Sequence, residues 1–422
     1  MVGPAALSWL LFAAVLVNQI GRVMVPSVMT SVLADKDFDV TAESRGFMLA
    51  VVSAVCLGGK FLGAAVTDKL GGWFMLILVF AGYGVSSLGL VLTSSPTTFA
   101  VMWWVNSLAY TIAWGAACQV IGASYSAADR PVQLTRIASA SRFGATLGSM
   151  VFGSLLKAGM TWRRTLLPAI PIQLLLSAVC TYLWLSSKPS VAAVEGGEKT
   201  GATKAPEPSP SEAASPWRHV TSLNFWLMFI PKVVLFTYTQ FFMNFVGPLL
   251  HSNYGFDHGD ATSLAGLGQG GSVLGLLVVG DMVYKKLTPT QKQKMVLGLL
   301  AICIVVPFTL AFAKRLPFDI SILAVPLLFL WSLAYALPFY LPPGEFALRI
   351  GGKSASALFT NLFDAGGFTL CFFWNSWASR ATKEGNFEAV LVSQAVFGVI
   401  SFVCMPLCLY RLEASVADKK KD

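Results

Sequence analysis

Apolar residues occur in long continuous runs along nearly the whole chain, and short polar segments separate the runs. The twelve runs that we distinguish cover residues 5–31, 46–67, 72–93, 98–126, 134–157, 165–187, 222–250, 261–284, 294–313, 320–346, 354–377 and 388–411. A helix of about 20 residues crosses a hydrocarbon core of ~30 Å. Strands of a closed barrel would instead alternate apolar and polar residues over about ten positions. The pattern therefore predicts twelve transmembrane helices.

Composition supports this interpretation. Hydrophobic residues make up 55% of the 422 positions, charged residues make up 12%, and the mean hydropathy is +0.67. Soluble domains carry roughly 25% charged residues, because their whole surface faces water. A soluble protein with a single large core is excluded.

Enzyme and metal signatures are absent from the sequence. Gly351-Gly-Lys-Ser354 resembles the end of a phosphate-binding loop, but Ala347 occupies the place of the leading glycine and apolar runs flank the segment. The seven cysteines lie inside apolar runs without zinc-ligand spacing, and the three histidines lie in loops or at the ends of runs. We therefore expect neither an enzyme nor a bound metal or cofactor.

The chain divides into two similar halves. We predict an N-terminal six-helix bundle (1–187), a flexible cytosolic linker (188–220) that is rich in Pro, Ala, Ser and charged residues, a C-terminal six-helix bundle (221–411) and a basic cytosolic tail (412–422). The segment 58–68 resembles 270–281, and 22–26 resembles 244–248, each about half a chain later. Parallel repeats of this kind build a central site that opens alternately to either side of a membrane.

The distribution of charge predicts the orientation. Most Lys and Arg residues between the runs fall on the side of the two termini, whereas the first loop on the other side is acidic, with Asp35, Asp37, Asp39 and Glu43. By the positive-inside rule, both termini are predicted to be cytosolic. The net charge of +9 then reflects contact with anionic lipid rather than nucleic acid. We expect a monomeric multi-pass protein, in either the plasma membrane or an organelle membrane.

Several charged residues lie inside the predicted spans. Arg22, Lys60, Arg142 and Lys232 are basic, and Asp364 and Glu345 are acidic. A charge at the bilayer centre costs at least ~2.5–3.5 kcal/mol, so such residues usually face a cavity and serve function. The alternative for any one of them is a structural ion pair. As a set they leave positive charge unbalanced, which predicts an anionic substrate.

Amides in the spans add uncharged donors and acceptors to this set. Asn18, Gln240 and Asn244 are candidate substrate ligands beside Arg22 and the other cations. The alternative for each amide is a hydrogen bond that holds two helices together.

The segment Lys60-Phe-Leu-Gly-Ala-Ala-Val-Thr-Asp68-Lys69, followed by Gly71, resembles the signature of the major facilitator superfamily between the second and third helices. The resemblance implies the major facilitator fold, with two pseudo-symmetric six-helix bundles. It also implies that Asp68 and the basic residue after it hold the inward side shut. In that fold the second helix lies beside the eleventh, so Lys60 and Asp364 are expected to pair.

Within the superfamily the chain most resembles the organophosphate:phosphate antiporters. Lys60 and Phe61 stand eight and seven residues before the loop Asp, as in that branch, and Lys353 to Phe363 resembles its entry to the eleventh helix. Asn18 and Gln240 hold positions where the branch has arginines. Arg22 lies close to the place of the Asp-Arg pair of the anion:cation symporters, and Arg142 stands where the antiporters have a histidine.

These observations predict a secondary transporter that moves phosphate, an organophosphate or an organic carboxylate by alternating access. A proton, sodium or a counter-substrate would be the coupling partner. Asp364, Glu345, Lys232 and Asp68 are the candidate coupling or gating residues. The alternatives are a proton-coupled transporter of a neutral or other small solute, and a transporter-like protein that binds without transporting.

Overall fold

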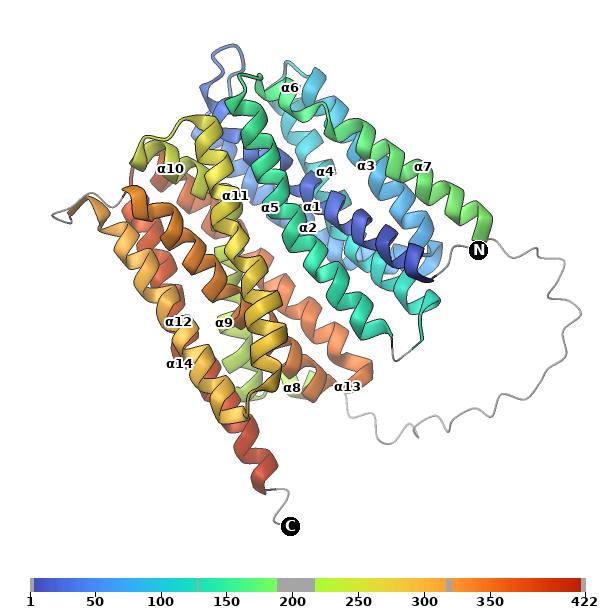
Figure 1. Ribbon diagram of the computed structural model, residues 1–422, viewed down its shortest axis with the longest axis vertical. Helices are drawn as coiled ribbons and strands as arrows, with labels where there is room; N and C mark the ends of the chain where they lie inside the picture. Colours follow the sequence, from blue (N-terminus) through green and yellow to red (C-terminus); the bar gives the residue numbers. More distant parts are fainter. Residues whose placement is uncertain (1–3, 127–128, 188–216, 316–320, 419–422) are drawn as a thin grey trace, which may run out of the picture.

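The computed structural model describes residues 4–126, 129–187, 217–315 and 321–418, and every regular element in these ranges is helical (Figure 1). The first half contains α1 Pro4–Ala34, α2 Ala42–Leu70, α3 Gly72–Leu92, α4 Pro96–Ser124, α5 Arg130–Lys157, α6 Trp162–Leu166 and α7 Ala169–Ser187. The second contains α8 Trp217–Val220, α9 Leu223–Asn244, α10 Val246–Tyr254, α11 His258–Leu274, η2 Gly275–Val283, η3 Tyr284–Lys286, α12 Pro289–Ala311, η4 Ala313–Arg315, α13 Ser321–Lys383 and α14 Phe387–Asp418.

The 63-residue α13 is not a single straight helix. Seventeen residues would separate Phe346 from Phe363 by roughly 25 Å along a straight helix, yet their ring centroids are 6.1 Å apart. The chain therefore doubles back between them, and α13 has two limbs, which correspond to the predicted spans 320–346 and 354–377. The first limb carries four prolines, which favour such departures from straight geometry.

Nine helical segments of the described chain are long and apolar enough to cross a membrane. The other three predicted spans are α4, α5 and the second limb of α13. Twelve helical crossings follow, as the sequence predicts, and the all-α fold class is confirmed.

Some boundaries differ from the sequence prediction. The sixth predicted span is broken into α6 and α7, the seventh is broken at Phe245 into α9 and α10, and the eighth ends in the π-helix η2. The last helix continues to Asp418, through most of the predicted basic tail. Most of the predicted linker, residues 188–216, lies outside the described residues.

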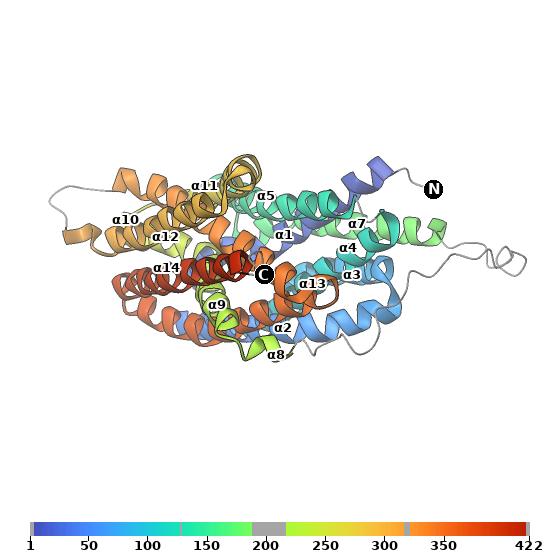
Figure 2. The same ribbon diagram turned by 90° about the horizontal axis from the view of Figure 1, so that it is seen from below.

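The two halves lie side by side. Seen from below, α3, α4 and α7 are on one side and α10, α12 and α14 on the other, with α2, α13, α5, α11, α1 and α9 between them (Figure 2). α5 packs against α11, and α2 packs against α13. Lys60 and Asp364, on α2 and α13, are thereby brought to the interface between the halves.

Packing reproduces the repeat seen in the sequence. In the first half a side chain at Gly59 or Gly63 would collide with Thr111 or Ile112 of α4. In the second half a side chain at Gly271 or Gly275 would collide with residues 329–333 of α13. Glycines at matching repeat positions therefore let equivalent helix pairs approach closely, which is how small residues act in membrane helix packing.

The end of the bundle that holds residues 35–41, between α1 and α2, we call the loop end. Trp162 Nε1 donates to Asp35 Oδ2 at 2.7 Å, and Arg163 Nη1 lies 3.2 Å from the same oxygen. The Trp162 hydrogen bond, together with the nearby Arg163 charge, holds the pKa of Asp35 below its usual value. This network ties the α1–α2 loop to α6.

Contacts between the halves run from the loop end to the middle of the bundle. Lys157 pairs with Asp260 at 2.6 Å, and Lys383 pairs with Glu43 at 3.4 Å. Toward the opposite, terminal end, where α1 begins and α14 finishes, α5 and α11 diverge (Figure 1). The molecule is thus closed at its loop end and spread at its terminal end.

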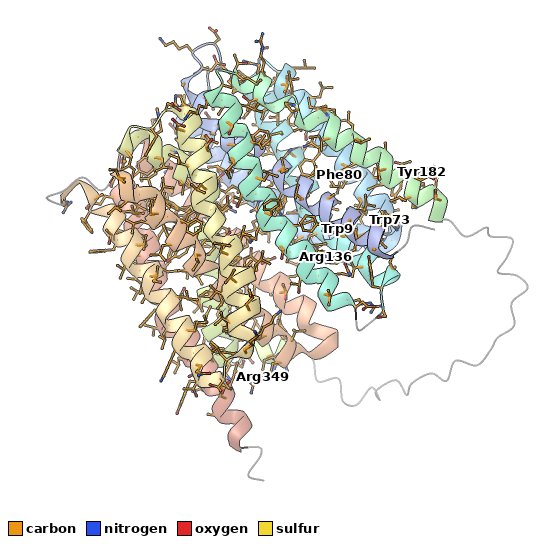
Figure 3. The ribbon with its side chains drawn as sticks, viewed as in Figure 1. Trp9, Trp73, Phe80, Arg136, Tyr182 and Arg349 are labelled. Carbon is orange, nitrogen blue, oxygen red and sulfur yellow. The ribbon has the colours of Figure 1, made fainter. Side chains whose placement is uncertain are left out.

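Basic side chains mark the terminal end. Arg136, near the start of α5, lies over the ring of Trp9 at 5.2 Å, and Arg349 Nη2 donates to the backbone oxygen of Leu412 at 2.6 Å. Figure 3 shows Arg136 and Arg349 on the side of the molecule that faces the two termini.

Candidate functional site

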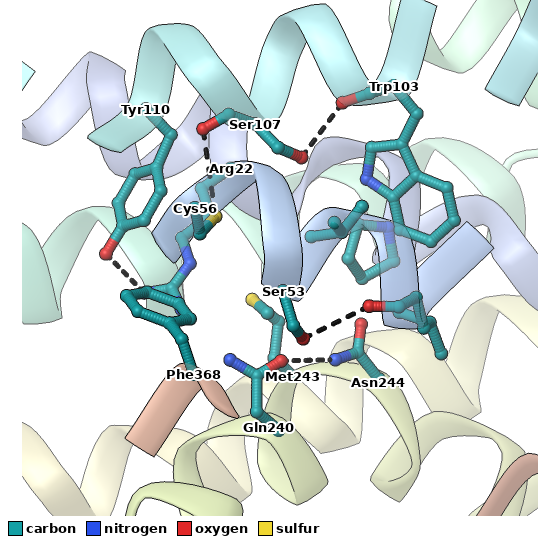
Figure 4. Close-up of a pocket in the computed structure, with 13 residues that line it drawn as sticks. Arg22, Ser53, Cys56, Trp103, Ser107, Tyr110, Gln240, Met243, Asn244 and Phe368 are labelled. Atoms are coloured by element: carbon teal, nitrogen blue, oxygen red, sulfur yellow. Dashed lines mark hydrogen bonds between the residues drawn. The ribbon is translucent and has the colours of Figure 1, made fainter. Parts of the chain in front are cut away.

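A pocket lies between the halves at the middle of the bundle. The first half lines it from α1, α2 and α4, and the second half lines it from α9 and α13 (Figure 4). Its polar lining consists of Arg22, Ser53, Ser107, Tyr110, Gln240 and Asn244. Its apolar lining consists of Pro26, Leu49, Val52, Cys56, Trp103, Met243 and Phe368.

Arg22 is the cation of this lining. Its Nη1 donates to the hydroxyl of Tyr110 at 2.8 Å, and its guanidinium carbon lies 4.2 Å from the centre of the same ring. These contacts fix the side chain while leaving most of its five N–H donors uncommitted. The planar fork of a guanidinium matches the geometry of carboxylate and phosphate groups.

The opposite wall carries two amides. Asn244 Nδ2 donates to Gln240 Oε1 at 3.0 Å, which orients both side chains (Figure 4). Asn244 Oδ1 is buried and has no hydrogen-bond partner. Arg45 Nη2 donates to the backbone oxygen of Asn244 at 3.0 Å, and its guanidinium lies over the ring of Phe245 at 4.9 Å. Arg45, which belongs to the first half, therefore contacts the end of α9 in the second half, at the point where that helix breaks.

A second charged group, the lysine–aspartate cluster, lies one helical turn from the pocket. It consists of Lys60, Lys232 and Asp364. The carboxylate of Asp364 is 3.1 Å from Lys60 Nζ and 3.8 Å from Lys232 Nζ. Lys60 follows the pocket residue Cys56 by one turn of α2, and Asp364 precedes the pocket residue Phe368 by one turn of α13. The predicted proximity of Lys60 and Asp364 is confirmed, and Lys232 is a further partner.

Lys232 is almost fully buried and has additional contacts. Its Nζ donates to the backbone oxygen of Phe339 at 3.2 Å and lies 3.2 Å from the centre of the Phe339 ring. Lys232 and Asp364 belong to the second half, whereas Lys60 belongs to the first. The Lys60–Asp364 contact is therefore the part of the cluster that crosses between the halves.

Arg142 adds a fourth cation near the middle of the bundle, over the ring of Tyr340 at 4.4 Å. Among the residues that the structure describes there, Arg22, Lys60, Lys232 and Arg142 face one carboxylate, that of Asp364. Positive charge in this region is not balanced by the protein, because ion pairs can neutralise only one of the four cations.

The other predicted site residues lie elsewhere. Asn18 Oδ1 accepts from the hydroxyl of Tyr83 at 2.9 Å, inside the first half and away from the pocket lining. Glu345 pairs with Lys292 at 3.1 Å and accepts from Tyr284 at 3.3 Å. The Glu345 side chain is 48% exposed, so it is not enclosed with the central cations. Asp68 lies in the last turns of α2, and its side chain is outside the described residues.

Sequence reasoning did not find some residues that matter here. Arg45 was taken to lie in a loop before the span that starts at 46, whereas α2 begins at Ala42 and buries it. Tyr110 and Ser107 lack a charge signal. The two residues lie one turn apart on α4, but this spacing identifies them as pocket residues only when the helices that pack against α4 are known.

Comparison with known proteins places this geometry in a family. The family model described as Major Facilitator Superfamily matches residues 11–369, which is most of the chain. No curated protein sequence matches the chain significantly.

Solved structures show the same fold. That of the nucleoside transporter NupG has a TM-score of 0.70 at 13% identity, over 96% of this chain and 99% of that one. A bacterial homologue of the human lysosomal transporter Spinster, inward-facing and occupied, gives 0.66 at 13% identity over 98% of both chains. A D-xylose-proton symporter gives 0.68 at 13% identity, over 94% of this chain and 96% of that one.

At such low identities, these likenesses establish the fold and leave the substrate open. The fold agrees with the family match, and a pocket between two packed halves is where such a fold would hold a small solute. The chain therefore belongs to the Major Facilitator Superfamily, and it is an integral, multi-pass membrane transporter rather than an enzyme.

Proposed function

We propose that this transporter moves a small anion by alternating access, with the anion bound in the central pocket at Arg22. The observation that carries the proposal is the charge imbalance: four cations surround the middle of the bundle and one carboxylate opposes them. Unpaired buried charge is costly, and a bound anion would lower that cost. Phosphate, organophosphates and organic carboxylates are the candidate classes, in keeping with the resemblance to the organophosphate:phosphate antiporters.

The lysine–aspartate cluster supports a mechanism of switching. The Lys60–Asp364 contact joins the halves one turn from the pocket, on the side where α5 and α11 begin to diverge. An anion that enters the pocket can compete with Asp364 for Lys60, so the halves would separate more readily when substrate is present. If a proton is coupled to transport, Asp364 is the carboxylate placed to carry it. A sodium ion or a counter-substrate would serve the same purpose.

We infer that the terminal end faces the cytosol, since Arg136 and Arg349 lie there. The structure would then have its pocket closed from the outside by the contacts at the loop end. An epitope at each terminus that is accessible only after the membrane is permeabilised would support this orientation. Access in sealed, right-side-out vesicles would reverse it.

Transport assays test the proposal directly. Vesicles that contain the purified protein would be loaded with one compound from a panel of phosphate, a sugar phosphate, sulfate and mono- and dicarboxylates. Uptake of the same compound, labelled and added outside, would then be measured. Xylose and a nucleoside, the solutes named for the structural neighbours, serve as neutral controls. Accelerated uptake of an anion that is lost in Arg22→Gln supports the proposal. Uptake of a neutral solute alone would refute it, and specific binding of an anion without uptake would favour a non-transporting protein.

A further inference from the structure

The residues that line the pocket indicate the chemical class of the ligand as well as the sign of the ligand's charge. We propose that the substrate is a small organic monocarboxylate with an apolar body and a hydroxyl group, rather than a phosphate. This inference rests on the proposed function, because it assigns a chemical class to the anion that Arg22 binds.

The first argument is the charge available inside the pocket. Arg22 is the one cation in the described lining. Lys60 and Lys232 both lie within 4 Å of Asp364, and Arg142 lies over Tyr340. A phosphate monoester carries about −1.5 to −2 charges near neutral pH, whereas a carboxylate carries one and fits the planar fork of a guanidinium with two parallel hydrogen bonds.

The second argument is the unpartnered acceptor on the opposite wall. Asn244 is 5% exposed, and its Oδ1 lacks a donor while its Nδ2 is used by Gln240. A buried acceptor without a partner is uncommon and disfavours the empty state. It would repel a carboxylate or phosphate oxygen but accept a hydrogen bond from a hydroxyl. An ammonium group could also donate, yet the surrounding cations disfavour it. The ligand therefore has its anionic group and its donor at different places.

The third argument is the apolar character of the side chains that line the pocket between Arg22 and Asn244. Trp103, Met243 and Phe368 face this space, with aliphatic residues beside them (Figure 4). Such walls favour an aromatic or branched aliphatic body, because they offer it apolar surface to pack against. A ligand with a carboxylate, one hydroxyl and an apolar body satisfies all three features.

Four matched probes separate these features. Mandelate has the carboxylate, the hydroxyl and a phenyl body. Phenylacetate lacks the hydroxyl, mandelamide lacks the charge, and phenyl phosphate replaces the carboxylate by a phosphate. Binding would be read from the protection of the pocket thiol Cys56 against alkylation, in a variant in which the other six cysteines are replaced by serine or alanine, and from the thermal stability of the unmodified protein.

Mandelate is expected to protect best. Phenylacetate should need about a five- to tenfold higher concentration to give the same protection of Cys56, because it lacks one hydrogen bond to a buried acceptor. Asn244→Leu, which keeps the side-chain size and removes the acceptor, should erase this preference by weakening mandelate while leaving phenylacetate binding in place. Thr239→Val is the matched control, because it removes a buried polar group of the same helix that lies outside the pocket lining and makes no contact with Asn244. Monodisperse elution of each variant from a sizing column verifies folding.

The outcomes distinguish this inference from the proposed function. Tighter binding of phenyl phosphate than of mandelate, or equal binding of mandelate and phenylacetate to the unmodified pocket, would overturn the monocarboxylate assignment and leave anion transport intact. Binding of mandelamide as strong as that of mandelate, unchanged in Arg22→Gln, would overturn both.

Discussion

Removing the carboxylate of Asp364 is predicted to destabilise the protein more than removing either lysine that contacts it. At an effective dielectric constant of about 20, charges at the observed 3.1 and 3.8 Å attract by ~5 and ~4 kcal/mol before desolvation is counted. Asp364→Asn strands two cations and should cost ~3–5 kcal/mol net. Lys60→Met leaves Asp364 with Lys232 and should cost only ~1.5–3 kcal/mol, as for one charged hydrogen bond.

The sharper expectation concerns the combined variant. Asp364→Asn raises the net charge of the cluster by one unit, and Lys60→Met lowers it by one unit, so the double variant regains the original net charge. Lys60→Met should therefore raise the thermal stability of Asp364→Asn although it lowers that of the unmodified protein. At about 2 °C per kcal/mol for a chain of this size, Asp364→Asn should melt roughly 6–10 °C lower.

Thermal unfolding of detergent-purified protein, at one fixed heating rate, measures these shifts. Lys292→Met is the control, because its partner Glu345 is half exposed and ion pairs near the surface contribute about 0–1 kcal/mol. Substrate anion should stabilise Asp364→Asn more than the unmodified protein, since it can replace the missing carboxylate. If Lys60→Met changes the melting temperature equally in the unmodified protein and in Asp364→Asn, the stability of the cluster does not depend on its net charge and the reasoning is refuted.

Three further predictions follow from other contacts. Arg45→Leu should weaken closure at the loop end, because the backbone oxygen of Asn244 loses the hydrogen bond from Arg45. Cys56 should then react faster with a membrane-impermeant thiol reagent added from outside, and an unchanged rate would contradict this. Glu345→Gln should preserve proton-driven uptake, if there is any, whereas Asp364→Asn should abolish it; the reverse pattern would restore Glu345 as the coupling group. The depressed pKa of Asp35 means that its contribution to stability is present above its unfolded value and lost as pH falls through the folded value. Asp35→Asn should accordingly flatten the acid-side loss of thermal stability, and an unchanged pH profile would contradict the assignment.

The sequence predicted the fold well because the physical constraint on it is strong. A backbone in lipid has to satisfy its own hydrogen bonds, so long apolar runs such as 72–93 become helices with few alternatives. Breaks were harder to predict. Phe245 interrupts the seventh span and residues 275–283 form a π-helix, and neither position differs from its apolar surroundings in a way that hydropathy detects.

The candidate site was predicted in part. Arg22, Lys60, Lys232 and Asp364 were visible because charge within an apolar run is rare, and the structure brings three of them into one cluster. The sequence could not assign Lys232 to Asp364, because they lie on different helices of the same half and their separation depends on how α13 doubles back. Asn18 carries the same chemical signal as Asn244, but it faces Tyr83 instead of the pocket.

The sharing of Asp364 between two lysines has a consequence for the return of the unloaded carrier. When the halves part, Lys60 leaves with the first half, whereas Lys232 and Asp364 stay together on the second. The carboxylate therefore keeps a counterion in both arrangements, and only one ammonium group has to be rehydrated. We therefore expect a modest electrostatic barrier to reorientation of the empty carrier, which would allow net flux down a gradient as well as one-for-one exchange.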